Sequence, residues 1–198
     1  FRILIYGNPK GGKSTLAIEF AKHLAEHHGK VLYEAIEEGF GATLQEKINR
    51  LGAKHPNLSF TDALQEDLSA YDFVFIDSIT KAGMNADDIH LLHEKYPRTG
   101  IIVIAQSTKD GSYKGARDLE HEVDVVIHVQ DGIAKSYGRF NQGGKMNLFD
   151  KDNVAEPQGL HGTKKNNSNA IPSKAISNAV KKKTFRMPDW TEPKHLNP

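Results

Sequence analysis

Eight consecutive residues near the start of the chain have the types and the spacing that bind phosphate groups. Residues 7–14 read Gly-Asn-Pro-Lys-Gly-Gly-Lys-Ser and match the pattern G-x-x-x-x-G-K-S/T at every fixed position. Glycines let the backbone wrap around an anion, and successive amide N–H groups followed by a helix N-terminus attract its charge. In this pattern the Lys13 ammonium reaches the β- and γ-phosphates of a nucleotide, and the Ser14 hydroxyl is a ligand of Mg²⁺. The residues expected to contact the nucleotide are Gly7, Asn8, Pro9, Lys10, Gly11, Gly12, Lys13, Ser14 and Thr15.

A second position with clear chemistry is Asp77, which ends the apolar run of residues 72–77. Ligands of open parallel sheets bind at the carboxyl ends of the strands, so this carboxylate is expected beside the phosphate loop. There it can hold Mg²⁺ together with the Ser14 hydroxyl, or through a water molecule. An aspartate at a strand end is on its own more often a turn or cap residue, and the phosphate loop upstream favours the metal role.

A third position is the pair Glu37 and Glu38, which follows another apolar strand and should emerge at the same sheet edge. A hydrolase needs a base that orients and deprotonates the attacking water, and one carboxylate near the γ-phosphate would serve. The alternative is two solvated glutamates before a glycine turn. Position alone does not decide between these interpretations.

The elements that must hold these residues alternate between strand and helix. An apolar strand, residues 3–6, enters the phosphate loop, and an amphipathic helix, residues 14–28, leaves it with Leu16, Phe20 and Leu24 on one face. Further strands are expected at residues 30–36, 57–60, 72–77 and 100–105, and further helices at residues 43–51 and 84–96. This pattern predicts an α/β fold with a mostly parallel central sheet flanked by helices.

The pattern changes after the last buried strand. Asp131-Gly132 lies between apolar runs at residues 123–130 and 133–140, which is a strong signal for a two-residue hairpin. Residues 141–144, Asn-Gln-Gly-Gly, are expected to form another turn before a strand at residues 145–149. The parallel core is therefore predicted to end in an antiparallel meander.

Composition divides the chain into a globular domain, residues 1–150, and a basic tail, residues 151–198. The tail holds nine Lys/Arg against four Asp/Glu and five of the eight prolines, and it has too little apolar sequence to build its own core. We expect the tail to be disordered or docked on a partner. The chain has no cysteine, which excludes disulfides and cysteine zinc sites, and no run long enough to span a membrane, which is compatible with a cytoplasmic protein. Because the chain opens directly on a strand, we expect a segment upstream to be missing.

Five blocks of sequence resemble the ATPase core of the RecA superfamily, and most of all its bacterial RadA (Sms) branch. The branch's loop G-E-P-G-S-G-K-S-T is matched at residues 7–15, Y-V-S-G-E-E-S at residues 33–39 and V-I-D-S-I at residues 75–79. G-H-V-T-K-E-G is matched at residues 105–111, and L-E-H-x-V-D follows at residues 119–124. The resemblance covers about residues 1–150. It implies a RecA-like P-loop NTPase that uses ATP and Mg²⁺, with Glu37 as catalytic glutamate and Gln106 as sensor of the γ-phosphate beside Lys13 and Asp77.

The chain departs from this family in three respects. Where the branch has K-N-R-F-G, this chain has Tyr137-Gly138-Arg139-Phe140, so the lysine is absent. No part of residues 1–198 resembles the family's four-cysteine zinc module or its protease-like domain. ParA/MinD-type ATPases are a rival, since they carry a signature lysine in K-G-G-x-G-K-S/T; here Lys10 stands three residues before Lys13 and not five, so the spacing fails.

A glycine-containing basic loop, residues 109–117, follows the expected strand that ends near Gln106. Cations with an aromatic residue suit the backbone and bases of single-stranded DNA, and the matching loop of RecA-like proteins contacts DNA. The alternative is a solvated loop without a specific partner. The tail cluster at residues 181–186 would add nonspecific affinity, or the tail would dock on a neighbouring subunit through Phe185 and Trp190. The DNA contacts expected are Lys109, Tyr113, Lys114 and Arg117.

Three functions remain open from the sequence. The first is a RecA/RadA-like ATPase that binds DNA, expected to be single-stranded, as a homo-oligomer in recombination, repair or replication, with hydrolysis stimulated by DNA. The second is a ParA-like or other ATP-dependent regulatory switch that does not remodel DNA. The third is a nucleotide-binding assembly component with little turnover. No membrane partner is expected.

Overall fold

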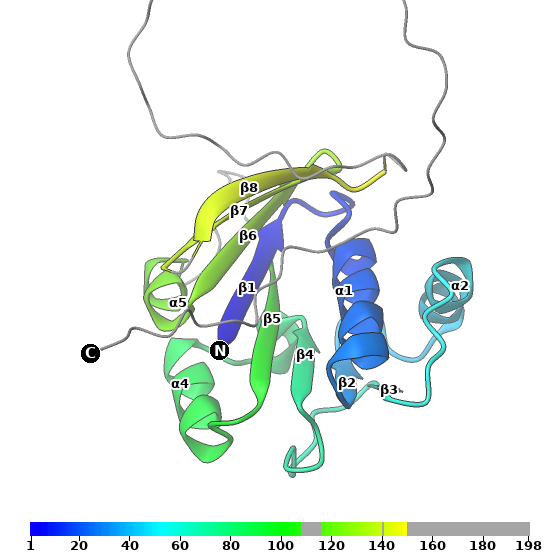
Figure 1. Cartoon of the computed structure of the whole chain (residues 1–198), viewed down its shortest axis with the longest axis horizontal. Coiled ribbons are helices and arrows are strands. Elements are labelled where there is room, and N and C mark those ends of the chain that lie inside the picture. Colours follow the sequence, from blue (N-terminus) through cyan, green and yellow to red (C-terminus); the bar gives the residue numbers. More distant parts are fainter. Residues whose placement is uncertain (108–115, 140, 150–198) are drawn as a thin grey trace, which may run out of the picture.

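The computed structural model describes residues 1–107, 116–139 and 141–149, which form one eight-stranded sheet with helices against it (Figure 1). The expected boundary between domain and tail, at residue 150, lies outside these residues. The strands are β1 (Arg2–Gly7), β2 (Val31–Glu34), β3 (Leu58–Thr61), β4 (Phe73–Asp77), β5 (Gly100–Gln106), β6 (Val125–Gln130), β7 (Ile133–Gly138) and β8 (Asn141–Asn147). The helices are α1 (Lys13–His27), α2 (Ala42–Arg50), α3 (Ile79–Ala82), α4 (Ala86–Lys95) and α5 (Ala116–Glu122).

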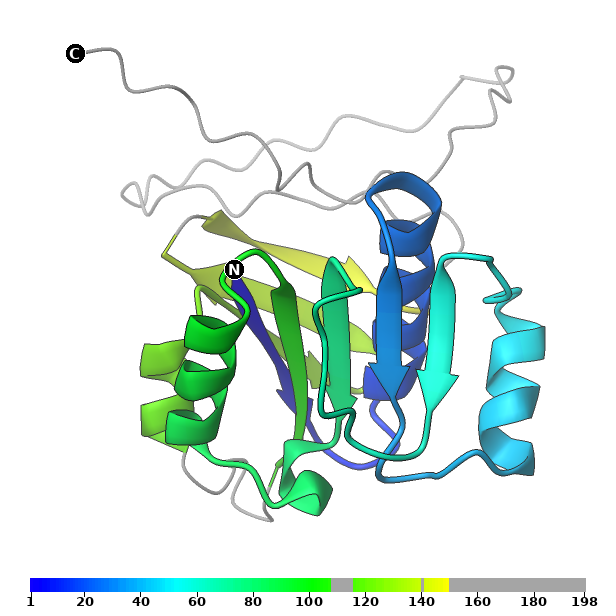
Figure 2. The same cartoon turned by 90° about the horizontal axis from the view of Figure 1, so that it is seen from below.

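The strand order is β3-β2-β4-β5-β1-β6-β7-β8. The first six strands in this order pair in parallel, and β6, β7 and β8 pair antiparallel. In Figure 2 the cyan β3 forms one edge of the parallel part, next to β2. The mostly parallel sheet followed by an antiparallel meander confirms the fold predicted from the sequence.

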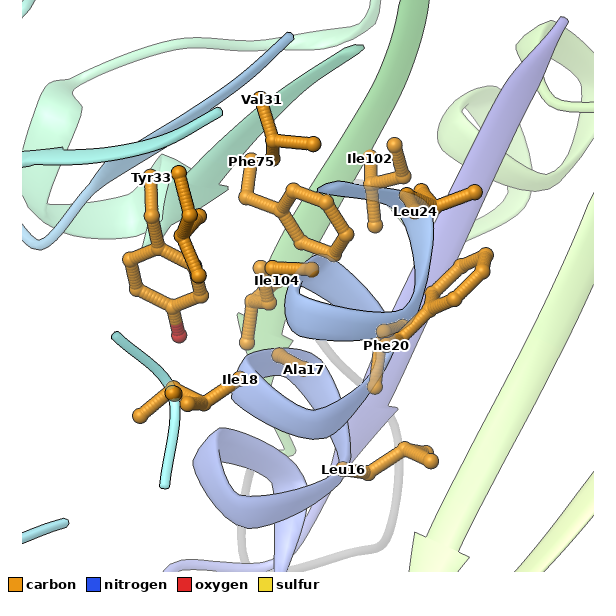
Figure 3. Packing of buried hydrophobic residues seen from close by; sticks show 14 of the residues in the cluster. Leu16, Ala17, Ile18, Phe20, Leu24, Val31, Tyr33, Phe75, Ile102 and Ile104 are labelled. Carbon is orange, nitrogen blue, oxygen red and sulfur yellow. The ribbon is translucent and has the colours of Figure 1, made fainter. Parts of the chain in front are cut away.

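One face of the sheet is covered by α1 and α2. The predicted apolar stripe of α1 is confirmed: Leu16, Phe20 and Leu24 are 4%, 6% and 5% exposed. Phe20 meets the ring of Phe75 on β4 edge to face, with 5.6 Å between ring centroids (Figure 3). This packing fixes α1, and with it the phosphate loop that precedes it, against the middle of the sheet.

The other face is covered by α3, α4 and α5, which bury a second cluster that includes Leu4, Val74 and Ile101. Because both faces are covered, β4 and β5 are apolar on both faces over most of their length and carry polar residues only at their carboxyl ends, Asp77 and Gln106. Within the described ranges, no helix is long and apolar enough to cross a membrane.

One helix prediction needed correction, and two helices, α3 and α5, were not expected from the sequence. The helix expected at residues 84–96 begins only at Ala86, because Asn85 caps it: its side chain accepts from the Asp88 backbone, and the Asp88 side chain accepts from the Asn85 backbone N–H. The helix α5 was not predicted. Its seven residues are mostly polar, so they carry little apolar periodicity, and Leu119 supplies the buried contact.

The hairpin at Asp131-Gly132 is present, and both residues have positive φ (50° and 77°), as a tight two-residue turn requires. The turn expected at residues 141–144 is wrong, because these residues lie within β8. Gly138 pairs with Asn141, and the register then shifts before Ser136 pairs with Gly144. Gly143, with φ of 81°, supplies the extra residue of a β-bulge; the glycine pair marked a bulge and not a turn.

Glu34 is a buried carboxyl group at the end of β2. Its side chain is 1% exposed and accepts one hydrogen bond, from the Gln65 backbone N–H at 2.7 Å. Burial raises the pKa of Glu34 to about 7, against an ordinary value of 4.5, and the Gln65 bond opposes this only in part. The folded chain therefore binds an extra proton between these two pH values, and its stability decreases as the pH rises through them.

We predict that Glu34→Gln, which is uncharged at every pH, removes this pH dependence. In urea unfolding between pH 4.5 and pH 8, the wild type should lose on the order of 2–3 kcal/mol of stability that the variant keeps. Glu46→Gln, on the exposed side of α2, is the control and should follow the wild type. Parallel stability curves for Glu34→Gln and the wild type would show that Glu34 titrates normally.

Candidate nucleotide site

The parallel register brings the carboxyl ends of the central strands to one edge of the sheet. Gly7 on β1 pairs with Gln106 on β5, and Asp77 on β4 pairs with Ile104, which is also on β5. Lys13 begins α1 at the same edge, directly after the phosphate loop. The sheet thus places residues that are up to 99 positions apart in the sequence around one site.

The phosphate loop has the backbone shape that its glycines suggested. Gly12 has φ of 104° and Lys10 has φ of 64°, and the Gly11 N–H donates to the Asn8 carbonyl at 3.2 Å. Only a residue without a side chain fits at Gly7, since a Cβ there would lie 1.8 Å from the Val129 carbonyl oxygen of β6. The loop therefore begins at a position of β1 where the backbone of β6 leaves room for glycine alone.

The meander braces this loop from the side, a contact that the sequence did not indicate. The Gly132 N–H of the hairpin turn donates to the Gly11 carbonyl at 3.2 Å, and the Leu148 N–H donates to the Gly132 carbonyl at 2.7 Å. The Leu148 and Phe149 side chains lie near Gly12, where a Cβ would approach them to 2.9 Å and 3.4 Å. The antiparallel strands therefore help to hold the loop in place.

Lys13 is the buried cation of the site, with 8% of its surface exposed. Its Nζ donates to the Asn8 carbonyl at 2.9 Å, across the phosphate loop. Burial lowers the pKa of Lys13, while the negative charges of Asp77 and Glu37 oppose this shift. The Lys13 ammonium therefore lies in the electric field of both carboxylates, and it can reach an anion bound within the phosphate loop.

Asp77 is the buried carboxylate, with 7% of its surface exposed. The Tyr33 hydroxyl of the neighbouring strand donates to its Oδ2 at 2.6 Å. Burial raises the pKa of Asp77; the Tyr33 bond and Lys13 oppose this, and the charges of Glu37 and Glu38 add to it. Tyr33 was missed in the sequence, although a tyrosine inside a fully buried strand needs a partner for its hydroxyl.

The residues present fit a magnesium ion. Asp77 and Ser14, in the first turn of α1, offer carboxylate and hydroxyl oxygens, which Mg²⁺ prefers together with water and nucleotide phosphates. Within the described ranges, no group of three or more metal-binding side chains occurs. This is the donor set expected where phosphate oxygens complete the coordination sphere.

The two glutamates have different partners in the structure. The Glu37 backbone N–H donates to the Asp77 carbonyl at 2.9 Å, and its carboxylate accepts from the Gln106 side chain. Glu38 instead forms an ion pair with Lys47 of α2. Geometry thus brings Glu37, and not Glu38, together with Asp77 and Gln106, while the catalytic roles remain predictions.

Most of the expected DNA loop lies outside the described residues. Lys109, Tyr113 and Lys114 lie outside the described residues, and of Arg117 only the backbone position near the start of α5 is described. The strand before this loop ends beside the nucleotide site, since the Ser107 N–H donates to the Gly7 carbonyl at 3.0 Å. Arg139, which this chain keeps from the family's K-N-R-F-G motif, donates to the His121 carbonyl at 2.9 Å.

The family model and the relatives that match this chain agree with the resemblance to RadA-type ATPases. A family model described as an AAA domain matches residues 1–91. The DNA repair protein RadA of Campylobacter jejuni is 32% identical over 67% of this chain and 34% of its own length. RadA of Mycolicibacterium smegmatis is 29% identical over 79% of this chain and 41% of its own length. The chain thus spans about a third to two fifths of the length of these curated relatives.

Two solved structures share the fold at low identity. The flagellar accessory protein FlaH of Methanocaldococcus jannaschii has a TM-score of 0.56 at 13% identity, covering 74% of this chain and 84% of that one. A KaiC-like protein of Pyrococcus horikoshii has a TM-score of 0.51 at 14% identity, covering 73% of this chain and 84% of that one. At these identities the likeness concerns the fold alone.

We predict that Tyr33→Phe disturbs the site through Asp77. Loss of the 2.6 Å donor leaves a buried carboxylate less satisfied and should lower stability by about 1–3 kcal/mol. It also removes a bond that lowers the pKa of Asp77, so that pKa should rise. Titration with Mg²⁺ and a nonhydrolysable ATP analogue from pH 5 to 8 should show binding lost at a higher pH than in the wild type.

Tyr71→Phe is the matched control, because no side-chain hydrogen bond of the Tyr71 hydroxyl occurs within the described residues, and it should leave the pH profile unchanged. An unshifted acid limb in Tyr33→Phe would mean that Tyr33 does not tune Asp77.

Proposed function

This chain carries a RecA-superfamily P-loop ATPase core, and we propose that it binds ATP with Mg²⁺, hydrolyses the ATP and acts on DNA as a homo-oligomer. The observation that carries the proposal is the convergence of Lys13, Asp77, Glu37 and Gln106 at the edge of the sheet that holds the phosphate loop. A phosphate cradle without these side chains would serve binding alone.

Each side chain has a part in the proposed reaction. The loop amides and Lys13 hold the β- and γ-phosphates. Glu37 orients a water molecule and accepts its proton as the water oxygen bonds to the γ-phosphorus. The bond from the γ-phosphorus to the bridging oxygen breaks, and ADP leaves with that electron pair. When bound at Ser14 and Asp77, Mg²⁺ would neutralise the charge that develops on the phosphate oxygens.

Gln106 fits the role of a γ-phosphate sensor. Its side-chain amide donates to Glu37, and its backbone pairs with Gly7 at the start of the phosphate loop. A γ-phosphate oxygen would compete with Glu37 for this amide, and the competition would free the carboxylate for its water. The strand that carries Gln106 ends at this residue, and the chain goes on through Ser107 to the expected DNA loop, so Gln106 would lie between the nucleotide and the DNA.

Action on DNA is supported by the relatives, which are named DNA repair proteins, and by the basic sequence of residues 109–117. The process would be recombination, repair or replication, and the homo-oligomer follows from the resemblance to RecA-like proteins. The absent lysine at Tyr137 favours a second candidate, a nucleotide-binding assembly component with little turnover. An ATP-dependent switch that leaves DNA unchanged is the third.

We predict that Glu37→Gln separates binding from hydrolysis. The amide keeps the shape of the side chain but cannot accept the proton, so turnover should decrease by roughly 10²–10⁴-fold while ATP still binds. Phosphate release and calorimetric titration measure the two quantities on the same sample. Glu38→Gln, which loses the ion pair with Lys47 and a nearby charge that acts on Asp77, is the control. An inactive Glu38→Gln beside an active Glu37→Gln would reverse the assignment.

DNA-stimulated hydrolysis is the second test of the function. We predict that single-stranded DNA accelerates phosphate release by the wild type, and that a nonhydrolysable ATP analogue shifts the protein to a larger species in size-exclusion chromatography. Hydrolysis that DNA leaves unchanged would favour the switch, and binding without hydrolysis would favour the assembly component.

A further inference from the structure

One face of the meander carries a line of basic side chains across three neighbouring strands. The register pairs His128 of β6 with Lys135 of β7, and Lys135 with Lys145 of β8. We propose that this basic row, His128, Lys135 and Lys145, together with the adjacent rings of Tyr6 and Tyr137, binds single-stranded nucleic acid. This inference rests on the proposed action on DNA and gives it a surface formed by described residues.

The core fixes which face these residues occupy. On each of the three strands the neighbouring residue packs in the cluster under α1: Ile127 and Val129 on β6, Ala134 on β7 and Met146 on β8. Successive side chains of a strand point to opposite faces, so the basic row lies on the face away from α1. Lys135 and Lys145 are exposed there.

The two lysines of the row carry positive charges on neighbouring strands. Like charges directly opposite each other on adjacent strands are destabilising, and Lys135 and Lys145 are such a pair. Neither forms an ion pair within the described part of the chain. Burial and the charge of Lys135 lower the pKa of His128. A row of phosphates would supply the missing negative charge, and its binding would relieve the repulsion.

Aromatic rings flank the row and are held in position. Tyr6 stacks on His128 with 4.6 Å between ring centroids and an interplanar angle of 17°. The Tyr6 and Tyr137 hydroxyls lie 3.2 Å apart, and the Tyr137 hydroxyl also donates to Glu120 of α5 at 3.2 Å. Tyr137 nevertheless remains 42% exposed. A fixed and exposed ring beside lysines suits a stacked base, which an acidic peptide would not need.

The surface also borders the segment expected to contact DNA. Tyr6 precedes Gly7, whose carbonyl accepts from Ser107 at the point where that segment begins. The segment ends at α5, whose Glu120 holds Tyr137. The described residue before this segment and the helix after it, α5 (Figure 1), thus both contact residues at or next to the two rings.

The test is binding of fluorescent oligo-dT by the full chain with a nonhydrolysable ATP analogue, measured by anisotropy at several salt concentrations. The double variant Lys135→Gln/Lys145→Gln should reduce the slope of log affinity against log salt by about 1.4, which is about 0.7 for each lost phosphate contact. The double variant Lys30→Gln/Lys54→Gln removes two exposed lysines elsewhere and should keep the wild-type slope. Hydrolysis without DNA should be equal in all three proteins.

The ring is tested separately. Tyr137→Ala should weaken oligo-dT binding by about 5- to 150-fold, whereas Tyr137→Phe, which keeps the ring, should stay close to the wild type. The same weakening in both variants would assign the effect to the hydroxyl bonds and not to stacking.

Three outcomes would overturn the proposal, and they can be told apart. DNA binding and DNA-stimulated hydrolysis that the lysine double variant leaves unchanged would remove the meander surface and keep the proposed function. A wild type that does not bind oligo-dT would remove both. Binding of polyglutamate in preference to oligo-dT, lost in the double variant, would assign the surface to an acidic protein.

Discussion

Parallel pairing of the central strands is the constraint on which the site depends. Parallel strands end at the same edge of a sheet, so the last residues of β1, β4 and β5 meet although the chain between them is long. At Gly7, where β1 ends and the phosphate loop begins, the Val129 carbonyl of β6 leaves no space for a side chain. The start of α1 follows at once, and its buried stripe locks the loop onto the core.

Burial and attraction between opposite charges act against each other on the two buried charged groups of the site, Lys13 and Asp77. Desolvation disfavours both the Lys13 ammonium and the Asp77 carboxylate, while each partly supports the other. Tyr33 supports Asp77 from the neighbouring strand, and Gln106 holds Glu37 from the other side. Introducing a triphosphate and its metal would shift each of these contacts. A site poised in this way suits a protein whose nucleotide state changes what it binds.

The meander connects the nucleotide site with the rest of the molecule. Its hairpin turn donates a hydrogen bond to the phosphate loop, and its face away from α1 carries the basic row.

Local sequence was enough to predict the phosphate loop, the apolar strands and the Asp131-Gly132 turn, since each depends on neighbouring residues. It was not enough for contacts set by register: the Tyr33–Asp77 bond, the choice between Glu37 and Glu38, and the bulge at Gly143 all depend on which strands pair. The helix α5 was not predicted, because its mostly polar residues show no apolar periodicity around the buried Leu119.

A crystal structure of the chain with Mg²⁺ and a nonhydrolysable ATP analogue would test the central claim most directly. The account predicts the β- and γ-phosphates within hydrogen-bond distance of the loop amides and of Lys13 Nζ, with the metal at Ser14 beside Asp77. It also predicts Glu37 released from Gln106 and bonded to a water in line with the γ-phosphorus. A nucleotide bound on another surface, or Glu38 in the place of Glu37, would contradict it.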